Sequence, residues 1–306
     1  RMRQQSLVVT SALPSAALAL FDGSALVETR IDTGSVFQLT SRRFQESNTI
    51  IQAGNVQIGD GPVQIIAGPC AVESREQVVA VADLLREQGI RLFRGGLFKP
   101  RTSPYTFQGL GFAGMEILRE LKTRYNLRIV TEALSEKCLE QLVGIADIIQ
   151  IGSRNMQNFS LLKEAGGAGC PVLLKRGPSS KLEELLLAAE YIVDAGNPRV
   201  ILCERGIRTY ETATRNTLDI AAVPVVKQLS HLPIVIDPSH AAGKREYVKA
   251  LTLAALAVGA DGVMVEVHPD PSKALSDGRQ SLHFDEFSEL MSEVRRLAEF
   301  RAPVSV

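Results

Sequence analysis

From residue 63 onward, short apolar runs alternate with longer segments that carry apolar residues every three or four positions. The short runs are rich in valine and isoleucine, which is typical of buried strands, and the longer segments have the period of amphipathic helices. Glycines follow several of the longer segments, where helices commonly end. The predicted strands are Val63–Ala67, Arg91–Arg94, Arg128–Thr131, Ile148–Ile151, Val172–Leu174, Val200–Cys203, Ile234–Ile236 and Gly262–Glu266.

The segments between these strands predict helices. Among them are Ser74–Gln88, Met115–Tyr125, Ser135–Val143, Lys181–Ala195 and Lys244–Val258. Eight strand–helix units in one domain predict an α/β fold of the TIM (β/α)8 barrel type. The alternative is a doubly wound open sheet, which would need a glycine-rich phosphate-binding turn after its first strand. The first strand is followed by Gly68-Pro69-Cys70, which is not such a turn.

A smaller element precedes the barrel. The pattern of Thr49–Gly61 predicts a β-hairpin that turns at Ala53-Gly54-Asn55. We expect this hairpin to close the bottom of the barrel, and the alternative is an ordinary linker. We therefore divide the chain into an N-terminal extension, residues 1–45, and a catalytic barrel with its hairpin, residues 46–306.

The extension predicts a strand near Ser6–Thr10, a helix near Pro14–Phe21 and a strand near Ala25–Asp32. Its basic first residues and apolar stretch also resemble a signal peptide, but Pro14 and several hydroxyl residues interrupt that stretch. Because the first residue is arginine and the three elements amount to about half of a small α/β module, we expect a truncated or incomplete module.

Composition excludes several classes of function. Lys and Arg number 34 and Asp and Glu also number 34, and a net charge of zero argues against nucleic-acid or membrane-surface partners. No apolar run reaches the length that spans a membrane. The four cysteines form no CxxC pair, and a chain of this size does not need disulfides, so we expect a reducing, cytoplasmic location.

Candidate functional residues follow the strand ends. In a TIM barrel the loops after the strands build the active site. A charged residue beyond a strand is ordinarily a solvated loop residue, but such residues after every strand predict a ring around one rim. In chain order they are Cys70, Arg94, Lys99, Arg101, Glu132, Arg154, Lys175, Arg176, Glu204, Arg205, Asp237, His240, Glu266 and Asp277.

The cations of this ring suit a substrate that carries phosphate and carboxylate groups, because guanidinium binds both in a bidentate manner. The sequence KPRTS, Lys99–Ser103, adds a second oxyanion site on a proline-stiffened loop, and its alternative is a generic basic turn. Lys175 also admits a Schiff-base aldolase. The convergent cations are Arg94, Lys99, Arg154, Lys175 and Arg205.

Cys70, His240, Glu266 and Asp277 offer a thiolate, an imidazole and two carboxylates, a mixed set that suits a divalent transition metal. A bound cation would hold Cys70 as thiolate. Two alternatives stay open for Cys70: a small core residue, or a nucleophile with His240 as its base. Glu73, close behind Cys70, is interpreted as a first-turn helix carboxylate.

Together, these residues lie in motifs that resemble a known family. The motifs are IIAGPC, FRGGLFKPRTSPYTFQGLG, TEA, IGSRNMQN, LLKRG, CERGIRTYE and DPSHAAGK. They are similar to those of 3-deoxy-D-arabino-heptulosonate 7-phosphate (DAHP) synthases of the type I beta branch, from about Thr49 to about Glu299. The same branch contains the 3-deoxy-D-manno-octulosonate 8-phosphate synthases. Those enzymes typically have an Asn-Arg-Ser variant in place of KPRTS, so the heptulosonate type is favoured.

The resemblance implies that phosphoenolpyruvate condenses with erythrose 4-phosphate and releases phosphate, in the first step of the shikimate pathway of aromatic amino acid biosynthesis. It implies one divalent metal, with manganese, iron, cobalt, zinc and cadmium all admitted. The implied metal ligands are Cys70, His240, Glu266 and Asp277. The implied phosphoenolpyruvate site is Arg94, Lys99, Arg154, Lys175 and Arg205.

The resemblance also implies that Arg101, Thr102 and Ser103 bind erythrose 4-phosphate, with Asp237 close to that substrate. Lys99 is the candidate for proton transfer to the forming hydroxyl, and Glu132 for placing the water. Homotetramers are usual in this family. Some members carry an N-terminal ferredoxin-like domain that binds tyrosine or phenylalanine. Residues 1–40 resemble its second half only, which leaves feedback inhibition open.

Four hypotheses for the whole chain therefore remain. The first is the metal-dependent DAHP synthase. The second is the octulosonate synthase, which uses arabinose 5-phosphate, and the third is a Schiff-base aldolase built on Lys175. The fourth is a non-catalytic barrel that binds or regulates a partner, which the intact ring of cations and metal ligands argues against.

Overall fold

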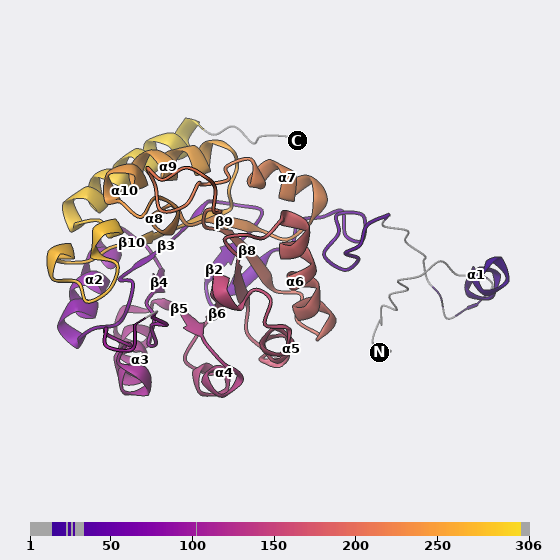
Figure 1. The fold of residues 1–306 in the computed structure, drawn as a ribbon, viewed down its shortest axis with the longest axis horizontal. Coiled ribbons are helices and arrows are strands. Elements are labelled where there is room, and N and C mark those ends of the chain that lie inside the picture. The colour runs from indigo at the N-terminus through magenta and orange to yellow at the C-terminus, as the bar shows by residue number, and fades with distance from the viewer. Residues whose placement is uncertain (1–13, 23, 26, 28–33, 102, 301–306) are drawn as a thin grey trace.

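The computed structural model describes residues 14–22, 24–25, 27, 34–101 and 103–300. Eight strands pair in parallel, each with the next along the chain and the last with the first, into a closed barrel (Figure 1). The strands are β3 (Gln64–Gly68), β4 (Leu92–Arg94), β5 (Arg128–Ala133), β6 (Ile148–Ile151), β7 (Val172–Lys175), β8 (Val200–Glu204), β9 (Ile234–Ile236) and β10 (Gly262–Glu266). The TIM barrel prediction is confirmed, and the doubly wound alternative is wrong.

Helices surround the barrel (Figure 1). They include every helix that the sequence pattern predicted, with ends that differ by at most one residue. Ser74 accepts a hydrogen bond from the backbone of Gln77, and Gly89 has φ +72°, so both ends of α2 are capped as expected. The helices after the first barrel strand are α2 (Arg75–Glu87), α3 (Met115–Tyr125), α4 (Glu136–Leu142), α5 (Phe159–Gly167), α6 (Leu182–Asp194), α7 (Ala222–Leu229), α8 (Pro238–Ala242), α9 (Arg245–Ala257) and α10 (Phe284–Phe300).

The core has two layers because neighbouring residues of a strand point to opposite faces. On β3, Ile65 and Ala67 pack outward against the helices, whereas Ile66 points into the barrel. The interior layer is completed by one or two residues from each other strand, such as Leu92 and Met264. Burial on both faces explains why the strands read as unbroken apolar runs.

A two-stranded hairpin of β1 (Ile51–Ala53) and β2 (Val56–Ile58) closes the bottom of the barrel. Its turn falls at Gly54, which has φ +60°. One face of the hairpin, which includes Ile51 and Ile58, belongs to the same buried cluster as the barrel interior. The prediction of a hairpin that closes the barrel is therefore confirmed, and the linker alternative is wrong.

Helix α1 (Ser15–Asp22) matches the helix predicted in the extension and lies to one side of the barrel (Figure 1). The strand predicted near Ser6–Thr10 lies outside the described residues, as does most of the strand predicted near Ala25–Asp32. The division of the chain at residue 45 stays a prediction. Among the described residues, no helix combines the length and the apolarity needed to cross a membrane.

The chain that joins this extension to the hairpin is anchored on the barrel. The Glu190 carboxylate accepts hydrogen bonds from the backbone N–H groups of Gln38, Leu39 and Thr40. His231 contacts the Leu39 carbonyl through Nε2 and the Thr49 hydroxyl through Nδ1. Residues 38–49 therefore enter the hairpin from a fixed position on α6 and on the loop before β9.

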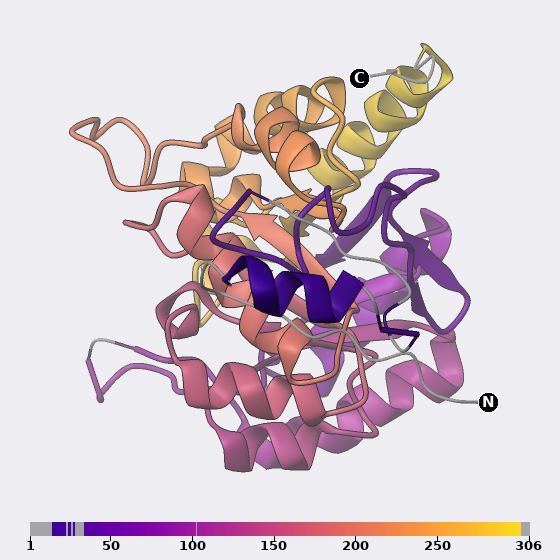
Figure 2. The same ribbon diagram turned by 90° about the vertical axis from the view of Figure 1, so that its right-hand side faces the viewer.

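The loops at the carboxyl ends of the strands include four short 3-10 turns. These turns are η1 (Gly111–Gly114), η2 (Ser153–Asn155), η3 (Pro271–Lys273) and η4 (Gly278–Gln280). Figure 2 shows two long loops that project from one side of the barrel, one after β4 and one after β8. The first contains Lys99 and Arg101, and the second runs between the bridged residues Ile207 and Thr217.

The hairpin allows a stability test. We expect Ile58→Ala to lower the free energy of unfolding by about 2–5 kcal/mol, because it leaves a cavity in the closed end of the barrel. Gln57→Ala, on the exposed face of the same strand, should change it by less than about 0.5 kcal/mol. Urea unfolding monitored by circular dichroism measures both, and equal losses would contradict a plug role.

Candidate active site and metal centre

Most of the predicted rim residues gather around one cavity of about 520 Å³ at the carboxyl ends of the strands. Arg176 and Glu204 do not line it and instead pair with each other at 2.9 Å. Asp237 and Glu266 are fully buried beside it. Thr102 lies outside the described residues. The remaining predicted site residues line the cavity: Cys70, Arg94, Lys99, Arg101, Ser103, Glu132, Arg154, Lys175, Arg205, His240 and Asp277.

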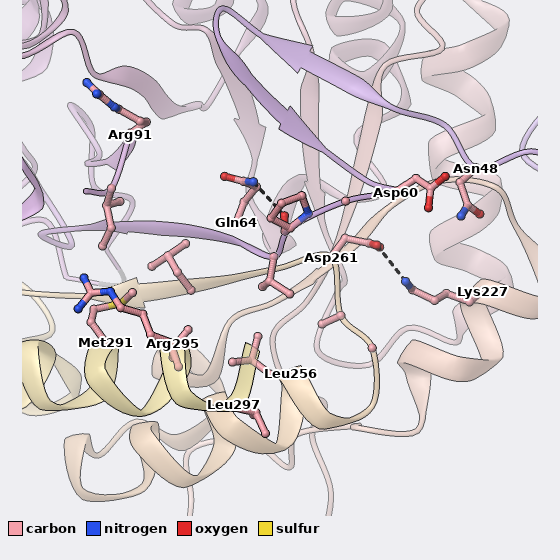
Figure 3. Close-up of a pocket in the computed structure, with 18 of the residues that line it drawn as sticks. Asn48, Asp60, Gln64, Arg91, Lys227, Leu256, Asp261, Met291, Arg295 and Leu297 are labelled. Carbon is pink, nitrogen blue, oxygen red and sulfur yellow. Dashed lines mark hydrogen bonds and ion pairs between the residues drawn. The ribbon is translucent and has the colours of Figure 1, made fainter. Parts of the chain in front are cut away.

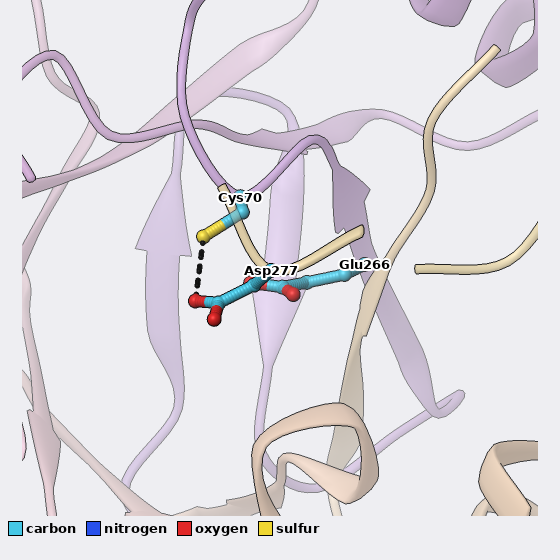
Figure 4. Close-up of side chains that lie close together, drawn as sticks. All are labelled: Cys70, Glu266 and Asp277. Atoms are coloured by element: carbon cyan, nitrogen blue, oxygen red, sulfur yellow. Dashed lines mark hydrogen bonds between the residues drawn. The ribbon is translucent and has the colours of Figure 1, made fainter. Parts of the chain in front are cut away.

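Three predicted metal ligands form one cluster, drawn in Figure 4. The Cys70 Sγ and a carboxylate oxygen each of Glu266 and Asp277 all lie within 4.8 Å of one another. The Cys70 thiol donates to Asp277 Oδ2 at 3.1 Å. His240 lies at the edge of the cluster, with Nε2 3.5 Å from Glu266 Oε1. All four predicted ligands are thus brought together.

Asp237 sets the orientation of the His240 ring on the side away from the cluster. Its Nδ1 is 2.7 Å from Asp237 Oδ2, which leaves Nε2 facing Glu266. The same Asp237 carboxylate pairs with the Lys175 ammonium. A carboxylate behind a ligating histidine is a common support in metal sites because it fixes the ring and its tautomer.

Lys99 lies against the cluster. Its Nζ donates to Cys70 Sγ at 2.7 Å and to Asp277 Oδ2 at 2.8 Å. Burial lowers the pKa of Lys99, but the charges of Cys70, Glu266 and Asp277 outweigh it and raise that pKa overall. The cluster therefore stabilises a positive charge at these donor atoms.

Burial shapes the acid–base states of the ligands. Burial, with Glu266 adding to it, raises the pKa of the Cys70 thiol to about 12. Burial also lowers the pKa of His240 to about 4, with Lys175 acting in the same direction and Asp237 opposing. Burial raises the pKa of Asp277, but Lys99 outweighs it and holds this carboxyl well below its usual range. The imidazole is neutral and Asp277 is ionised near neutral pH.

The donor chemistry of these residues fits a divalent transition metal. One sulfur, one imidazole nitrogen and two carboxylate oxygens are the ligand types that such ions take in proteins. Cys70 Sγ and one oxygen each of Glu266 and Asp277 lie within 4.8 Å of one another, so a single ion could contact all three, and His240 Nε2 lies next to Glu266. A coordinated cation also deprotonates a thiol, which removes the obstacle of the raised Cys70 pKa.

The cations occupy the other side of the cavity. Arg94 donates through one NH1 to the Pro69 carbonyl at 2.6 Å and to Glu266 Oε1 at 3.1 Å. Arg205 is buried, and burial lowers its pKa. Arg154 is exposed and donates to the Pro100 carbonyl at 2.9 Å, which ties it to the KPRTS loop. The predicted convergence of cations is present.

Sequence reasoning missed several residues of the site. Arg208 and Arg215 also line the cavity. Arg215 NH1 lies 3.5 Å from Asp277 Oδ1 and donates to Gln280 Oε1, and Gln280 in turn donates to Glu266 Oε2 at 2.7 Å. Both arginines lie in the loop after β8, so the expectation that loops after strands build the active site could have identified them. No sequence signal marked Gln280.

The interpretation of Glu73 as a first-turn carboxylate is wrong. Helix α2 begins at Arg75 with Ser74 as its N-cap, so Glu73 precedes the helix. Its side chain is only 9% exposed and contacts His268 and the backbone of Leu275, on the loop after β10. Hydrogen bonding across the rim, rather than the helix dipole, holds this carboxylate.

A larger cavity of about 1290 Å³ lies at the opposite end of the barrel, between the hairpin side and the helices α9 and α10 (Figure 3). Its Asp261 carboxylate already accepts from Lys227 and from the backbone of Ile234, both within 3 Å. Apolar side chains such as Leu256 and Met291 make up much of the wall. The reactive groups belong to the smaller cavity, where barrel enzymes carry their active sites.

Comparisons with known proteins agree with this geometry. A family model described as the DAHP synthetase I family matches residues 41–300. A phospho-2-dehydro-3-deoxyheptonate aldolase of Thermotoga maritima is 54% identical over 279 residues, which covers 91% of this chain and 82% of that protein. A 2-dehydro-3-deoxyphosphooctonate aldolase of Syntrophotalea carbinolica is 33% identical over 244 residues, covering 74% and 87%.

Solved structures match as well. The crystal structure of the DAHP synthase from Thermotoga maritima superimposes with a TM-score of 0.86 at 51% identity, and covers 98% of this chain and 85% of that chain. A truncated form of the synthase from the same organism gives a TM-score of 0.81 at 53% identity, with coverage of 86% and 96%. The chain belongs to the DAHP synthetase I family.

Proposed function

We propose that this chain condenses phosphoenolpyruvate with erythrose 4-phosphate to form 3-deoxy-D-arabino-heptulosonate 7-phosphate and inorganic phosphate. This is the first step of the shikimate pathway. One observation carries the proposal: convergent cations and a cysteine–histidine–carboxylate cluster share a single cavity at the carboxyl ends of the barrel strands. Membership of the family, and the 54% identical relative of that name, support the same reaction.

Phosphoenolpyruvate is assigned to the cationic side of the cavity. It carries a phosphate and a carboxylate. The cations that would bind them are Arg94, Lys99, Lys175, Arg205 and the more exposed Arg154. Within the described part of the chain, the buried Nε of Arg94 has no hydrogen-bond acceptor. A buried unpaired N–H costs about 1–3 kcal/mol, and an anionic oxygen of the substrate would satisfy it.

Erythrose 4-phosphate is assigned to the KPRTS loop. Arg101 donates from NH1 to Ser276 Oγ at 3.0 Å, which places its guanidinium next to the metal-ligand cluster. Ser103 lines the same cavity, and Thr102 is assigned from the resemblance. The phosphate of the aldehyde substrate would then lie on this loop, with its carbonyl directed toward Cys70 and Asp277.

Cys70, His240, Glu266 and Asp277 would hold a divalent metal, which would supply Lewis-acid chemistry at the aldehyde carbonyl when bound. C3 of phosphoenolpyruvate forms the new bond to the aldehyde carbon. Lys99 holds ammonium protons next to Cys70 and Asp277, so we assign to it the proton that the forming hydroxyl gains. Water then adds at C2, and the bond from C2 to the phosphate oxygen breaks.

Glu132 is assigned to place that water. It lies at the end of β5, lines the cavity and accepts a hydrogen bond from Gln150 at 3.2 Å. The four cysteines of the chain are all free thiols, which supports a reducing compartment, and we propose the cytoplasm. The homotetramer that the resemblance implies stays a prediction, as does any aromatic amino acid effector.

Metal removal tests the reaction class. Phosphate release from the two substrates should cease after treatment with EDTA and return on addition of Mn²⁺ or Co²⁺, because the aldehyde is not polarised without a metal. A colorimetric phosphate assay measures this, and protein dialysed without chelator is the control. Turnover that survives EDTA would remove the metal-dependent mechanism and favour Schiff-base chemistry.

The thiol ligand allows a matched pair of variants. Cys70→Ala should lower kcat/KM by at least about 100-fold, because one of the metal ligands is lost. Its affinity for phosphoenolpyruvate should stay within about threefold of wild type, because the cationic side is untouched. Cys138→Ala removes a buried thiol on α4, away from the cavity, and should leave both values unchanged. Full activity of Cys70→Ala would contradict the assignment.

The second candidate is the octulosonate synthase, which the 33% identical relatives favour. The two functions differ in the aldehyde. We expect kcat/KM for erythrose 4-phosphate to exceed that for arabinose 5-phosphate by at least about 100-fold. Arabinose 5-phosphate is longer by one hydroxyl-bearing carbon, and a site that fits the shorter sugar leaves no room for it. Steady-state kinetics with both aldehydes decides, and a preference for arabinose 5-phosphate would reverse the assignment.

A further inference from the structure

We propose that Glu73 and His268 form a positioning pair that sets the distance between the metal ligands Cys70 and Asp277. This inference rests on the proposed metal site and adds residues that do not touch the metal or the substrates. Cys70 and Asp277 arrive on different segments, one after β3 and one on the loop after β10 (Figure 4). Something must hold these two segments in register, because their ligand atoms meet across 207 residues of sequence.

Hydrogen bonds to the start of helix α2 hold Glu73 in a fixed position close to Cys70. The Glu73 backbone N–H donates to Gln77 Oε1 at 3.1 Å, and the Gln77 amide donates to the Ala71 carbonyl at 3.3 Å. Gln77 is itself in the first turn of α2, which Ser74 caps. The segment from Cys70 to Glu73 is therefore fixed to the start of a helix.

From this position, both oxygens of the Glu73 carboxylate contact the loop after β10. Oε1 accepts the backbone N–H of Leu275 at 3.0 Å, and Oε2 lies 3.3 Å from His268 Nε2. Leu275 is two residues before Asp277. One carboxylate thus connects a position three residues after one ligand to a position two residues before another.

His268 has its proton placed for this role. Its Nδ1 accepts the backbone N–H of Asp270 at 3.0 Å, so the ring proton of the neutral imidazole lies on Nε2 and points to Glu73. The His268 backbone N–H donates to the Leu282 carbonyl at 3.0 Å. The start and end of residues 268–282 are therefore bonded to each other, and Glu73 binds both the start and the middle of this loop.

The Asp277 backbone makes such support necessary. Asp277 has φ +50°, in the left-handed region that non-glycine residues seldom adopt. Backbone in this region costs on the order of 1 kcal/mol or more and persists only when its surroundings hold it. Gly278, the next residue, packs so closely that a Cβ would lie 2.1 Å from the Pro271 carbonyl oxygen. Without the Glu73 contact, we expect the Asp277 backbone to leave this conformation and its carboxylate to turn away from Cys70.

Metal affinity in the absence of substrates is the measurement that tests the pair. After EDTA treatment, each protein is titrated with Co²⁺ and followed by calorimetry and by near-ultraviolet thiolate-to-cobalt absorption. Glu73→Ala should weaken Co²⁺ binding by about 10–100-fold, the usual effect of removing a group that orients a ligand. Phosphoenolpyruvate affinity should stay unchanged, because the cations lie on other strands.

Two further variants separate positioning from charge. Glu73→Gln keeps an oxygen that accepts from Leu275 and loses the contact with His268 Nε2–H, so its loss should lie between wild type and Glu73→Ala. Glu76→Ala removes an exposed carboxylate from the first turn of the same helix and should not change Co²⁺ binding. A loss of Co²⁺ affinity in Glu76→Ala as large as that in Glu73→Ala would assign the effect to lost charge and overturn the proposal.

Hydrogen exchange gives a readout that needs no metal. In metal-free protein, Glu73→Ala should speed the exchange of backbone amides in residues 270–280, and Glu76→Ala should not. Unchanged Co²⁺ affinity or unchanged exchange in Glu73→Ala overturns the positioning role alone. Absence of Co²⁺ binding by the wild type overturns the metal site and this inference together. Should Glu73→Ala fail to fold, Glu73→Gln, which keeps volume and polarity, carries the same test.

Discussion

Charges buried at the carboxyl end of the barrel have to be paired, and this requirement organises the whole site. A buried charge without a partner is strongly destabilising, because the interior solvates it poorly. Arg94 therefore contacts Glu266, Lys175 contacts Asp237, and Arg176 contacts Glu204, with every one of these side chains less than 7% exposed. Each pair joins neighbouring or nearby strands. Arg94 and Lys175, which line the cavity, are consequently held in place by carboxylates of the protein itself.

The strand order places these paired charges in a ring around one rim of the barrel, and the positions of this ring could be predicted from the sequence. Parallel strands all end at the same rim, so residues that follow strands meet there however far apart they lie in the sequence. Cys70, Arg94, Lys175 and His240 could be placed around one cavity on that ground alone. Unbroken apolar runs located every barrel strand, because strands buried on both faces leave little ambiguity.

Pairings between side chains could not be read in the same way. Gln280 binds Glu266, and Glu73 binds His268, through loops whose path depends on backbone conformations such as the left-handed Asp277. Glu73 shows why local patterns mislead here. A carboxylate two residues before a helix looks like a partner for that helix, whereas the structure directs it to a loop some 200 residues away. Sequence spacing carries no signal for such contacts.

The pairing rule also explains how one cavity serves opposite charges. Arg94 uses NH1 to hold Glu266 and the Pro69 carbonyl, next to Cys70, while its buried Nε is without an acceptor in the described part of the chain. One guanidinium therefore faces the ligand cluster on one side and offers an N–H to an anion on the other. Lys99 bridges Cys70 and Asp277 in the same boundary region. Because both cations contact atoms of the proposed metal ligands, the cationic groups and the ligand cluster meet at Arg94 and Lys99 inside one cavity.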